Sequence, residues 1–279
     1  MKSYFDQISF SASRMLTKRY STSFASSVHL LAPSIRQDIY NIYSFVRLAD
    51  EIVDSFQGYP QAALFYRFKQ DLILSLEDRI STNPILNAFQ HTVNQYAIPW
   101  AHIEAFMNSM EQDLSQKDYN TRKEFEAYIY GSADVVGLMC LRVFVAGDED
   151  KFKLLEQSAM RLGSAFQKIN FLRDIKDDLE ILERRYFPKV DLASLSAVEK
   201  SEIIDEIRED LRVGYLGILE LPVEAKLGVY MAYNFYKELL ARLDRTPPSR
   251  ILQTRVRVPN YQKIALLAKC YANYKLRMI

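Results

Sequence analysis

The sequence predicts an all-α protein, and three observations support this prediction. Only 8 glycines and 9 prolines occur among 279 residues, and they gather at plausible breaks between long uninterrupted segments. Within these segments apolar residues recur at spacings of three and four, as they do between residues 39 and 50. Alternating strand patterns are scarce, and 254–259 is the best short candidate. Because no repeat or low-complexity linker divides the chain, we expect one helical domain over residues 1–279.

Two helix starts carry a recognisable capping pattern. Ser34 follows Pro33 and is predicted to cap a helix that begins near Ile35 and includes the periodic segment. Thr121 is followed three residues later by Glu124, which is the spacing of a capping box. The second helix is predicted to run from there through residues 128 and 136.

Two later segments raise the question of a membrane. The most apolar stretch runs from Ala127 to Gly147, but Asp134 and Arg142 interrupt it, so we interpret it as a buried helix. A basic amphipathic segment over residues 263–277 is interpreted as a core helix, with a helix lying on a membrane surface as the alternative.

Composition excludes several classes of function. Lys plus Arg number 36 and Asp plus Glu 35, so the net charge of +1 gives no argument for nucleic acid. The two cysteines suggest neither a disulfide framework nor a zinc site, and three scattered histidines do not form a metal centre. The N-terminus lacks a signal-peptide pattern. We therefore expect a cytoplasmic protein, with peripheral contact at a membrane surface as an option.

Two pairs of aspartates have a spacing of four residues, Asp50 with Asp54 and Asp174 with Asp178. On a helix this spacing places both carboxylates of a pair on one face, about 6 Å apart along the axis. Two such pairs facing each other would form an all-oxygen site for Mg²⁺ ions that carry substrate phosphates. A solvent-exposed face with a salt bridge to Arg47 is the alternative interpretation of the first pair.

The second pair lies in a denser cluster. Gln167, Asn170, Asp174 and Asp178 follow one another at steps of three or four, so they share one stripe of a helix. The positions around the stripe are apolar, which predicts partial burial, and buried carboxylates require a partner or a metal. A polar seam between core helices is the alternative, but the two clusters together favour the metal site.

Four segments of the chain resemble the squalene/phytoene synthase family of head-to-head prenyl synthases, and its bacterial phytoene synthases most of all. They are residues 21–24, 43–54, 128–139 and 162–188, and the last is the most specific. The C-terminal third matches more weakly, through residues 235–240 and 255–258. The family fold is the isoprenoid synthase-type helical bundle around a central cavity, which the resemblance implies here.

The resemblance also implies roles for individual residues. Catalysis would involve both aspartate pairs and Tyr128, and Asn170 would join Asp50, Asp54, Asp174 and Asp178 as metal ligands. Substrate binding would involve Ser23, Phe24, Arg47, Gln167, Asn170, Arg173, Tyr186, Tyr236 and Arg255. Asp113 matches a further family carboxylate more weakly. The implied cofactor is Mg²⁺, with Mn²⁺ as an alternative ion, and NADPH is not expected.

The chain departs from the family pattern at two places. Asp134 stands where the family commonly has glycine, which affects the expected packing of that helix. The interval from Asp178 to Tyr186 is one residue longer than usual, and Arg184 and Arg185 replace the common Gly-Arg pair before that tyrosine. We therefore expect a different flap over the diphosphate.

The resemblance implies that the chain is a phytoene synthase. Such an enzyme joins two geranylgeranyl diphosphates through a cyclopropylcarbinyl diphosphate, and a tyrosine or the released diphosphate is the candidate acceptor of the final proton. One alternative is a squalene or dehydrosqualene synthase that uses farnesyl diphosphate. Another is a non-catalytic relative that acts as a binding or assembly protein, although all four motif aspartates are intact. A helical scaffold with ion-pair seams would not account for the four matching segments.

Overall fold

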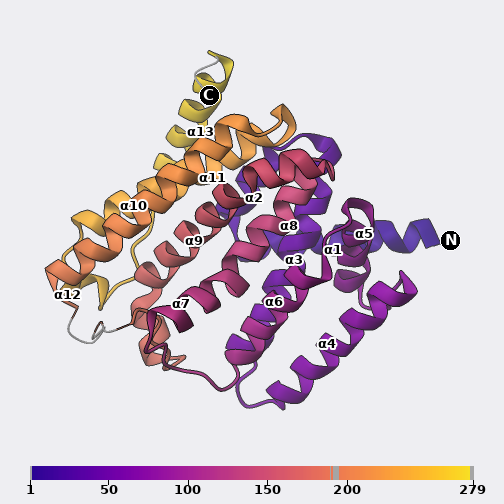
Figure 1. Cartoon of the computed structure of the whole chain (residues 1–279), viewed down its shortest axis with the longest axis horizontal. Coiled ribbons are helices and arrows are strands. Elements are labelled where there is room, and N and C mark those ends of the chain that lie inside the picture. Colours follow the sequence, from indigo (N-terminus) through magenta and orange to yellow (C-terminus); the bar gives the residue numbers. More distant parts are fainter. Residues whose placement is uncertain (1, 189, 191–194, 277–279) are drawn as a thin grey trace.

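The computed structural model describes residues 2–188, 190 and 195–276, and every regular element named in these ranges is a helix (Figure 1). The all-α prediction is therefore confirmed. The elements in order are α1 (Lys2–Tyr20), α2 (Thr22–His29), α3 (Pro33–Ser55), α4 (Gln61–Asp78), α5 (Pro84–Tyr96), α6 (Trp100–Gln112), α7 (Arg122–Ile129), η1 (Tyr130–Asp134), α8 (Val135–Phe144), α9 (Glu149–Glu180), α10 (Ala197–Glu220), α11 (Val223–Arg245), α12 (Pro248–Ile251) and α13 (Asn260–Lys275).

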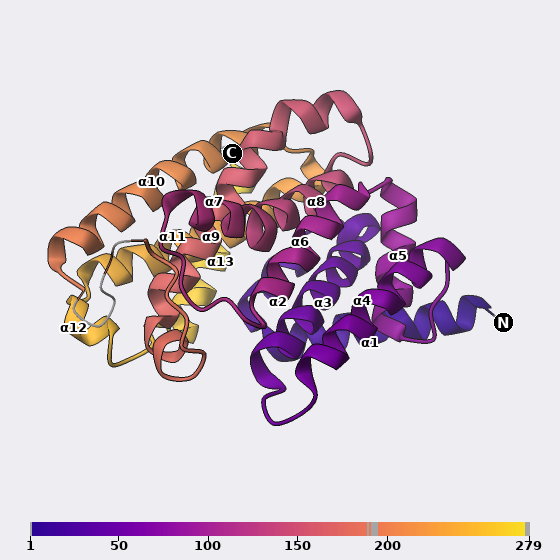
Figure 2. The ribbon, with the colours of Figure 1, turned by 60° about the horizontal axis from the view of Figure 1, so that its bottom comes forward.

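Helix α9 is the centre of the arrangement. It spans 32 residues, and in Figure 1 it lies between α10 and α11 on one side and α7 and α8 on the other. Its longest packing interface is with α10, and it also contacts α8, η1 and α11. The N-terminal helices form the other part of the molecule, where α1 packs on α3 and α5, as Figure 2 shows from a second direction.

Two clusters of buried apolar side chains hold these parts together. One gathers residues from α7 to α13, and the other gathers residues from α2 to α6 with the inner side of α8. Phe144 and Val229 pack against both clusters, so the two cores meet. A single continuous domain over residues 1–279 stays a prediction.

The predicted helix starts have different outcomes. Thr121 and Glu124 form the expected capping box, with each side chain bonded to the other residue's backbone N–H. The prediction for Ser34 is wrong, because α3 begins at Pro33 and Ala32 is its N-cap. Proline suits the first helical position, since its missing N–H would have no partner inside the helix and its φ is already helical.

Two predictions for the C-terminal region need correction. Residues 255–259 form an irregular extended link with no strand among the described residues, and the link ends at Pro259 before α13. The core-helix interpretation of the last helix holds for one side only, because Leu266 packs on the buried cluster and Cys270 is the one buried residue of α13. Arg277, at the end of the predicted segment, lies outside the described residues.

The apolar stretch predicted as a buried helix is confirmed as part of the core. Residues Arg122–Phe144 are long and apolar enough to cross a membrane, but more than half of the most apolar window is buried inside the protein. The helix is not uniform, since η1 is a widened π-type turn between α7 and α8. This turn lies against α9, where a Cβ on Gly163 would come within 2.8 Å of the Ala133 carbonyl oxygen.

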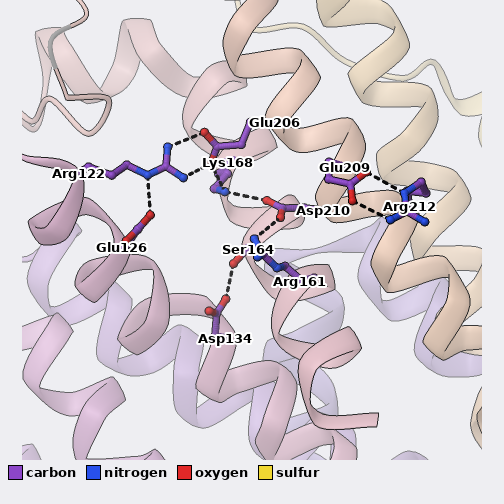
Figure 3. Close-up of polar contacts among 10 residues, drawn as sticks. All are labelled: Arg122, Glu126, Asp134, Arg161, Ser164, Lys168, Glu206, Glu209, Asp210 and Arg212. Carbon is purple, nitrogen blue, oxygen red and sulfur yellow. Dashed lines mark hydrogen bonds and ion pairs between the residues drawn. The ribbon is translucent and has the colours of Figure 1, made fainter. Parts of the chain in front are cut away.

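An ion-pair network with two buried members, Lys168 and Asp210, joins α9 to α10 and is drawn in Figure 3. Lys168 is 4% exposed and donates to Asp210, which is 1% exposed, at 2.7 Å, and it also pairs with Glu206. Arg161 donates to the other oxygen of Asp210 at 2.9 Å, and Arg122 of α7 binds both oxygens of Glu206. Buried charges of this kind are tolerated because each has a partner, and these fix the register of the two helices.

Asp134 lies close to this network, at the end of η1. It is 7% exposed, and its Oδ1 accepts a hydrogen bond of 2.6 Å from the Ser164 hydroxyl on α9 (Figure 3). Burial raises the pKa of Asp134 to about 6, although the bond from Ser164 and the charge of Lys168 act in the other direction. The departure from the usual glycine thus adds a polar link between η1 and α9.

We predict that Asp134→Asn stabilises the protein at neutral pH but not in acid. Folded Asp134 keeps its proton up to about pH 6, whereas the unfolded chain loses it near 3.8, so the folded state binds more protons between these values. The free energy of unfolding of the native protein therefore falls as pH rises from about 4 to about 6. Above this range the variant should be more stable by up to about 3 kcal/mol.

Urea unfolding at several pH values measures this difference. Exposed Asp71→Asn is the control and should change stability little at any pH. If Asp134→Asn changed the free energy of unfolding by the same amount in acid and at neutral pH, the role given to burial of this carboxyl would be contradicted.

Candidate active site

A cavity of about 580 Å³ lies within the helical bundle and is lined by residues of α1 to α3, α6 to α11 and η1, and by Arg255. Both predicted aspartate pairs line it, the first from α3 and the second from α9. The remaining walls are mainly apolar and come from α2, α3, α6, α8, α10 and α11. The cavity therefore joins a charged part to an apolar part, as a site for an amphiphilic ligand requires.

The first aspartate pair is held by two arginines. Arg47 forms ion pairs with Asp50 and Glu51, and its guanidinium lies over the ring of Tyr20, 4.5 Å from the ring centre. Asp54 accepts a hydrogen bond of 2.6 Å from Arg184. The salt bridge predicted as the alternative interpretation thus exists, but it lines the cavity rather than an exposed face.

The second pair is held differently. Asp174 accepts two hydrogen bonds from Arg173, at 2.9 and 2.5 Å, and pairs with Arg255 at 2.7 Å. Arg255 comes from the irregular link before α13, so this link closes over the end of α9. The negative charges of Asp174, Asp54 and Asp177 raise the pKa of Asp178. The positive charge of Arg184 lowers it.

The carboxylates of the two pairs influence each other across the cavity. Burial, followed by the charge of Asp54, raises the pKa of Asp50 to about 8. Burial, followed by the charges of Asp174 and Asp54, raises the pKa of Asp178 to about 8. Asp54 on α3 thus acts on Asp178 on α9, so the two pairs face the same space. The site has more negative charge than its arginines neutralise.

These residues have the chemistry of a divalent-cation site. Four carboxylates and the side-chain oxygen of Asn170 offer the hard oxygen ligands that Mg²⁺ prefers, and burial followed by neighbouring carboxylates raises the pKa values of Asp50 and Asp178. Among the described residues, no three acidic, histidine or cysteine side chains already converge closely enough to hold an ion. Arginines instead neutralise Asp50, Asp54 and Asp174.

Arg184 is the functional residue that sequence reasoning missed. Its side chain is 5% exposed and donates to the Asp54 carboxylate at 2.6 Å and to the Asp113 backbone carbonyl at 2.9 Å. It also lies 3.8 Å from the Asp113 carboxylate and 3.4 Å from the Tyr186 hydroxyl. The sequence did contain a signal for Arg184. The unusual pair Arg184 and Arg185 stands directly before Tyr186, in the segment that follows the second aspartate motif.

Asp113 and the aromatic side chains of Tyr128, Phe171 and Tyr186 form a stacked group beside the carboxylates. Tyr128 is buried and donates a hydrogen bond of 2.9 Å to Asp113, whose other oxygen has no hydrogen-bond partner among the described residues. Tyr186 stacks on Phe171 with ring centres 3.7 Å apart and on Tyr128 at 5.4 Å. Burial raises the pKa of Asp113 to about 7. The more weakly matched Asp113 therefore does belong to the cavity.

Most of the remaining predicted residues also line the cavity. Gln167, Asn170 and Arg173 do so from α9, and the hydroxyl of Tyr236 donates to Asn170 at 3.4 Å. Phe24 lines the wall and stacks on Tyr43 at 4.4 Å. Ser23 is the exception: it is half-buried but is not among the described lining residues, and its carbonyl accepts a hydrogen bond from Ser27.

The difference between Ser23 and Ser21 has a simple cause. Ser21 is the N-cap of α2, and its hydroxyl accepts from the Phe24 backbone N–H at 3.2 Å. The cap fixes the start of α2 and places Ser21 and Phe24 in the wall, whereas Ser23 lies outside it.

The apolar part of the cavity was not predicted residue by residue. Its walls include Val28 of α2, Phe106 of α6, Phe144 of α8, Leu155 of α9 and Ile218 of α10. These side chains come from five different helices. Their periodicity is the same as that of ordinary core residues, so the sequence offered no signal that separates a cavity wall from a filled core.

Comparisons with known proteins agree with this geometry. The family model for squalene/phytoene synthase matches residues 17–262. A 15-cis-phytoene synthase of Paracoccus sp. is 26% identical over 88% of this chain and 86% of its own length. A phytoene synthase of Arthrospira platensis is 25% identical over 93% of this chain and 91% of its own length.

Solved structures show the same fold. A dehydrosqualene synthase in complex with a ligand superposes with a TM-score of 0.83, 20% identity and coverage of 97% of this chain and 98% of the other. A squalene synthase of Alicyclobacillus acidocaldarius gives a TM-score of 0.74 at 21% identity, covering 87% of this chain and 96% of the other. At these identities the likeness establishes the fold alone. The fold, the site and the family model together establish that this chain belongs to the squalene/phytoene synthase family of prenyltransferases.

We predict that Arg184→Met destabilises the protein by about 3–5 kcal/mol, because it leaves the buried Asp113 carboxylate, the half-buried Asp54 carboxylate and two backbone carbonyls without their charged partner. Urea unfolding measures this loss. The neighbouring Arg185→Met is the matched control, since the side chain of Arg185 is 65% exposed and its variant should change stability by less than about 0.5 kcal/mol. Equal effects of the two variants would contradict the assignment.

Proposed function

We propose that this protein is a phytoene synthase, which joins two molecules of geranylgeranyl diphosphate head to head and releases diphosphate. The observation that carries the proposal is the meeting of two aspartate pairs and a set of arginines at one apolar cavity. The curated relatives named above support phytoene as the product.

The charged part of the cavity is suited to binding diphosphate groups. Arg47, Arg173 and Arg255 line the cavity, and in this structure each pairs with a motif aspartate. An arginine is able to present two parallel N–H donors to a phosphate, as it does to a carboxylate. When substrate enters, these side chains are available to exchange carboxylate oxygens for diphosphate oxygens.

The same aspartates would hold the divalent ions. Asp50, Asp54, Asp174 and Asp178 supply carboxylate oxygens, and Asn170 supplies an amide oxygen. Mg²⁺ bound there would neutralise the diphosphate and so make it a better leaving group. Ion binding would also relieve the repulsion between the carboxylates of the two pairs.

The apolar walls would protect the allylic cation that forms when diphosphate leaves. Phe24, Phe166, Phe171 and Tyr236 line this space, and aromatic faces attract a cation. The walls also exclude water, which would otherwise capture the cation.

The final proton has a candidate acceptor in the stacked group. Tyr128 lines the cavity and its hydroxyl is bonded to Asp113, which has a raised pKa and one oxygen without a hydrogen-bond partner among the described residues. We propose that the Tyr128 hydroxyl oxygen accepts this proton and passes its own proton to Asp113, to which it is hydrogen-bonded. Released diphosphate is the alternative acceptor.

A squalene or dehydrosqualene synthase is the second candidate. The observation in its favour is that the superposed structures are a dehydrosqualene synthase and a squalene synthase. It differs from the first proposal in the length of the prenyl chain, which the apolar part of the cavity accommodates.

We predict that Asp178→Asn and Asp50→Asn each lower the turnover of prenyl diphosphate by at least about hundredfold. Neither variant should lower the free energy of unfolding, because each removes a carboxylate whose charged form is disfavoured by burial and by neighbouring carboxylates. Diphosphate release and urea unfolding are the two measurements. Asp177→Asn is the control, since it lies beside Asp178 but is not among the described lining residues, and it should retain most of its activity. Unchanged turnover in Asp178→Asn would sink the metal role.

We further predict that the protein and Mg²⁺ convert geranylgeranyl diphosphate to phytoene at the same rate with and without NADPH. Chromatography and mass spectrometry of the extracted hydrocarbon identify the product. A parallel incubation with farnesyl diphosphate is the control. A thirty-carbon hydrocarbon made from farnesyl diphosphate, with nothing made from geranylgeranyl diphosphate, would favour the second candidate. No diphosphate release from either substrate would favour a binding protein.

A further inference from the structure

The C-terminal segment is charged differently from the rest of the chain. Residues 246–279 contain seven Lys or Arg and no Asp or Glu, which leaves 29 basic and 35 acidic residues elsewhere. The net charge of +1 is therefore the sum of a basic C-terminal segment and an acidic remainder of the chain. Arg257, Lys269 and Lys275 are exposed, and none has a carboxylate partner among the described residues.

The outward face of α13 is apolar and uncovered within the part of the chain that the structure describes. The helix packs on α11 through Leu266 and the buried Cys270, and Asn273 donates to the Tyr230 hydroxyl at 3.1 Å. The opposite face has exposed fractions of 70% at Tyr261, 68% at Ile264 and 50% at Tyr271, with exposed alanines between them. Figure 1 shows α13 on the outside of the molecule, so this face is available to a partner.

We infer that this face, defined by Tyr261, Ile264, Ala265, Ala268, Tyr271 and Ala272, lies on an anionic lipid surface. An interfacial helix combines apolar and aromatic residues with flanking Lys and Arg, and α13 has both features. Tyrosine suits the boundary because its ring is apolar and its hydroxyl remains hydrated. Lys269 and Lys275 have no carboxylate partner among the described residues. They would lie beside the lipid headgroups, whose negative charge attracts them.

Charge argues against a second copy of this chain as the occupant. In a symmetric dimer built on this face, each basic segment would lie against the same segment of the other copy. Lys269 and Lys275 would then face like charges, which is unfavourable. A lipid surface supplies the opposite charge.

The position of the segment links this surface to the cavity. Arg255 belongs to the same basic segment, lines the cavity and pairs with Asp174. The link 255–259 therefore connects this face of α13 directly to Arg255 in the charged part of the site. Here the inference rests on the proposed function, since a hydrocarbon product without polar groups leaves more favourably into lipid than into water.

Flotation with lipid vesicles tests the inference. We expect the full chain to bind vesicles of phosphatidylcholine mixed with an equal part of phosphatidylglycerol, and to bind phosphatidylcholine alone weakly. Binding should fall as salt is raised, because salt screens the attraction. The variant with Lys269→Gln and Lys275→Gln should lose about fivefold in partitioning for each lysine.

A second variant tests the apolar face and carries Tyr261→Ser, Ile264→Ser and Tyr271→Ser. All three side chains are at least half exposed, so the fold should be kept, which circular dichroism checks. This variant should lose binding to the mixed vesicles. The matched control carries the same kind of change at exposed apolar residues elsewhere, with Tyr59→Ser, Leu154→Ser and Val198→Ser, and should bind as the native protein does.

Four outcomes would overturn the inference: no binding to mixed vesicles, binding that neither α13 variant weakens, a dimer that the triple serine variant converts to a monomer, or binding to an acidic polypeptide that competes fully with the vesicles. The third would show that a second copy covers the face. The fourth would instead indicate a protein partner. Since the assay does not use turnover, its failure is distinct from failure of the proposed function.

Discussion

The electrostatic repulsion among the aspartates of α3 and α9 is the constraint on which the rest of the site depends. Two pairs of carboxylates line one cavity, and burial together with their mutual repulsion raises the pKa values of Asp50 and Asp178 to about 8. Such an arrangement is costly unless positive charge is supplied. In the structure arginines supply part of it, and divalent cations would provide the remainder.

The helical scaffold holds these charges in place. Helix α9 carries the second pair on one face, and on another face it is tied to α10 by Lys168 and Asp210 and to η1 through Ser164 and Asp134. Arg184 makes the corresponding connection between the segment after α9 and the end of α3. These links explain why like charges remain close together, since moving either helix would break buried hydrogen bonds whose partners have no access to water.

Much of this site was predictable because spacing within a helix is read directly from sequence. The steps of three and four placed Gln167, Asn170, Asp174 and Asp178 on one stripe, and all four line the cavity. The capping box at Thr121 was predictable for the same reason, since it is local. Features that depend on distant segments were not: Arg184 reaches a residue 130 positions earlier, and the exposure of α13 depends on what α11 leaves uncovered. The apolar walls and the absence of Ser23 from the lining were likewise decided by packing.

The central claim is that both aspartate pairs act together on one set of ions, and calorimetric titration with Mg²⁺ in the presence of inorganic diphosphate tests it most directly. The account predicts that the native protein binds Mg²⁺ more tightly with diphosphate than without it. It also predicts that Asp54→Asn on α3 and Asp174→Asn on α9 each abolish this enhancement. If the enhancement by diphosphate survived either substitution, the account would be contradicted, because the aspartates of one helix alone would then hold the ions.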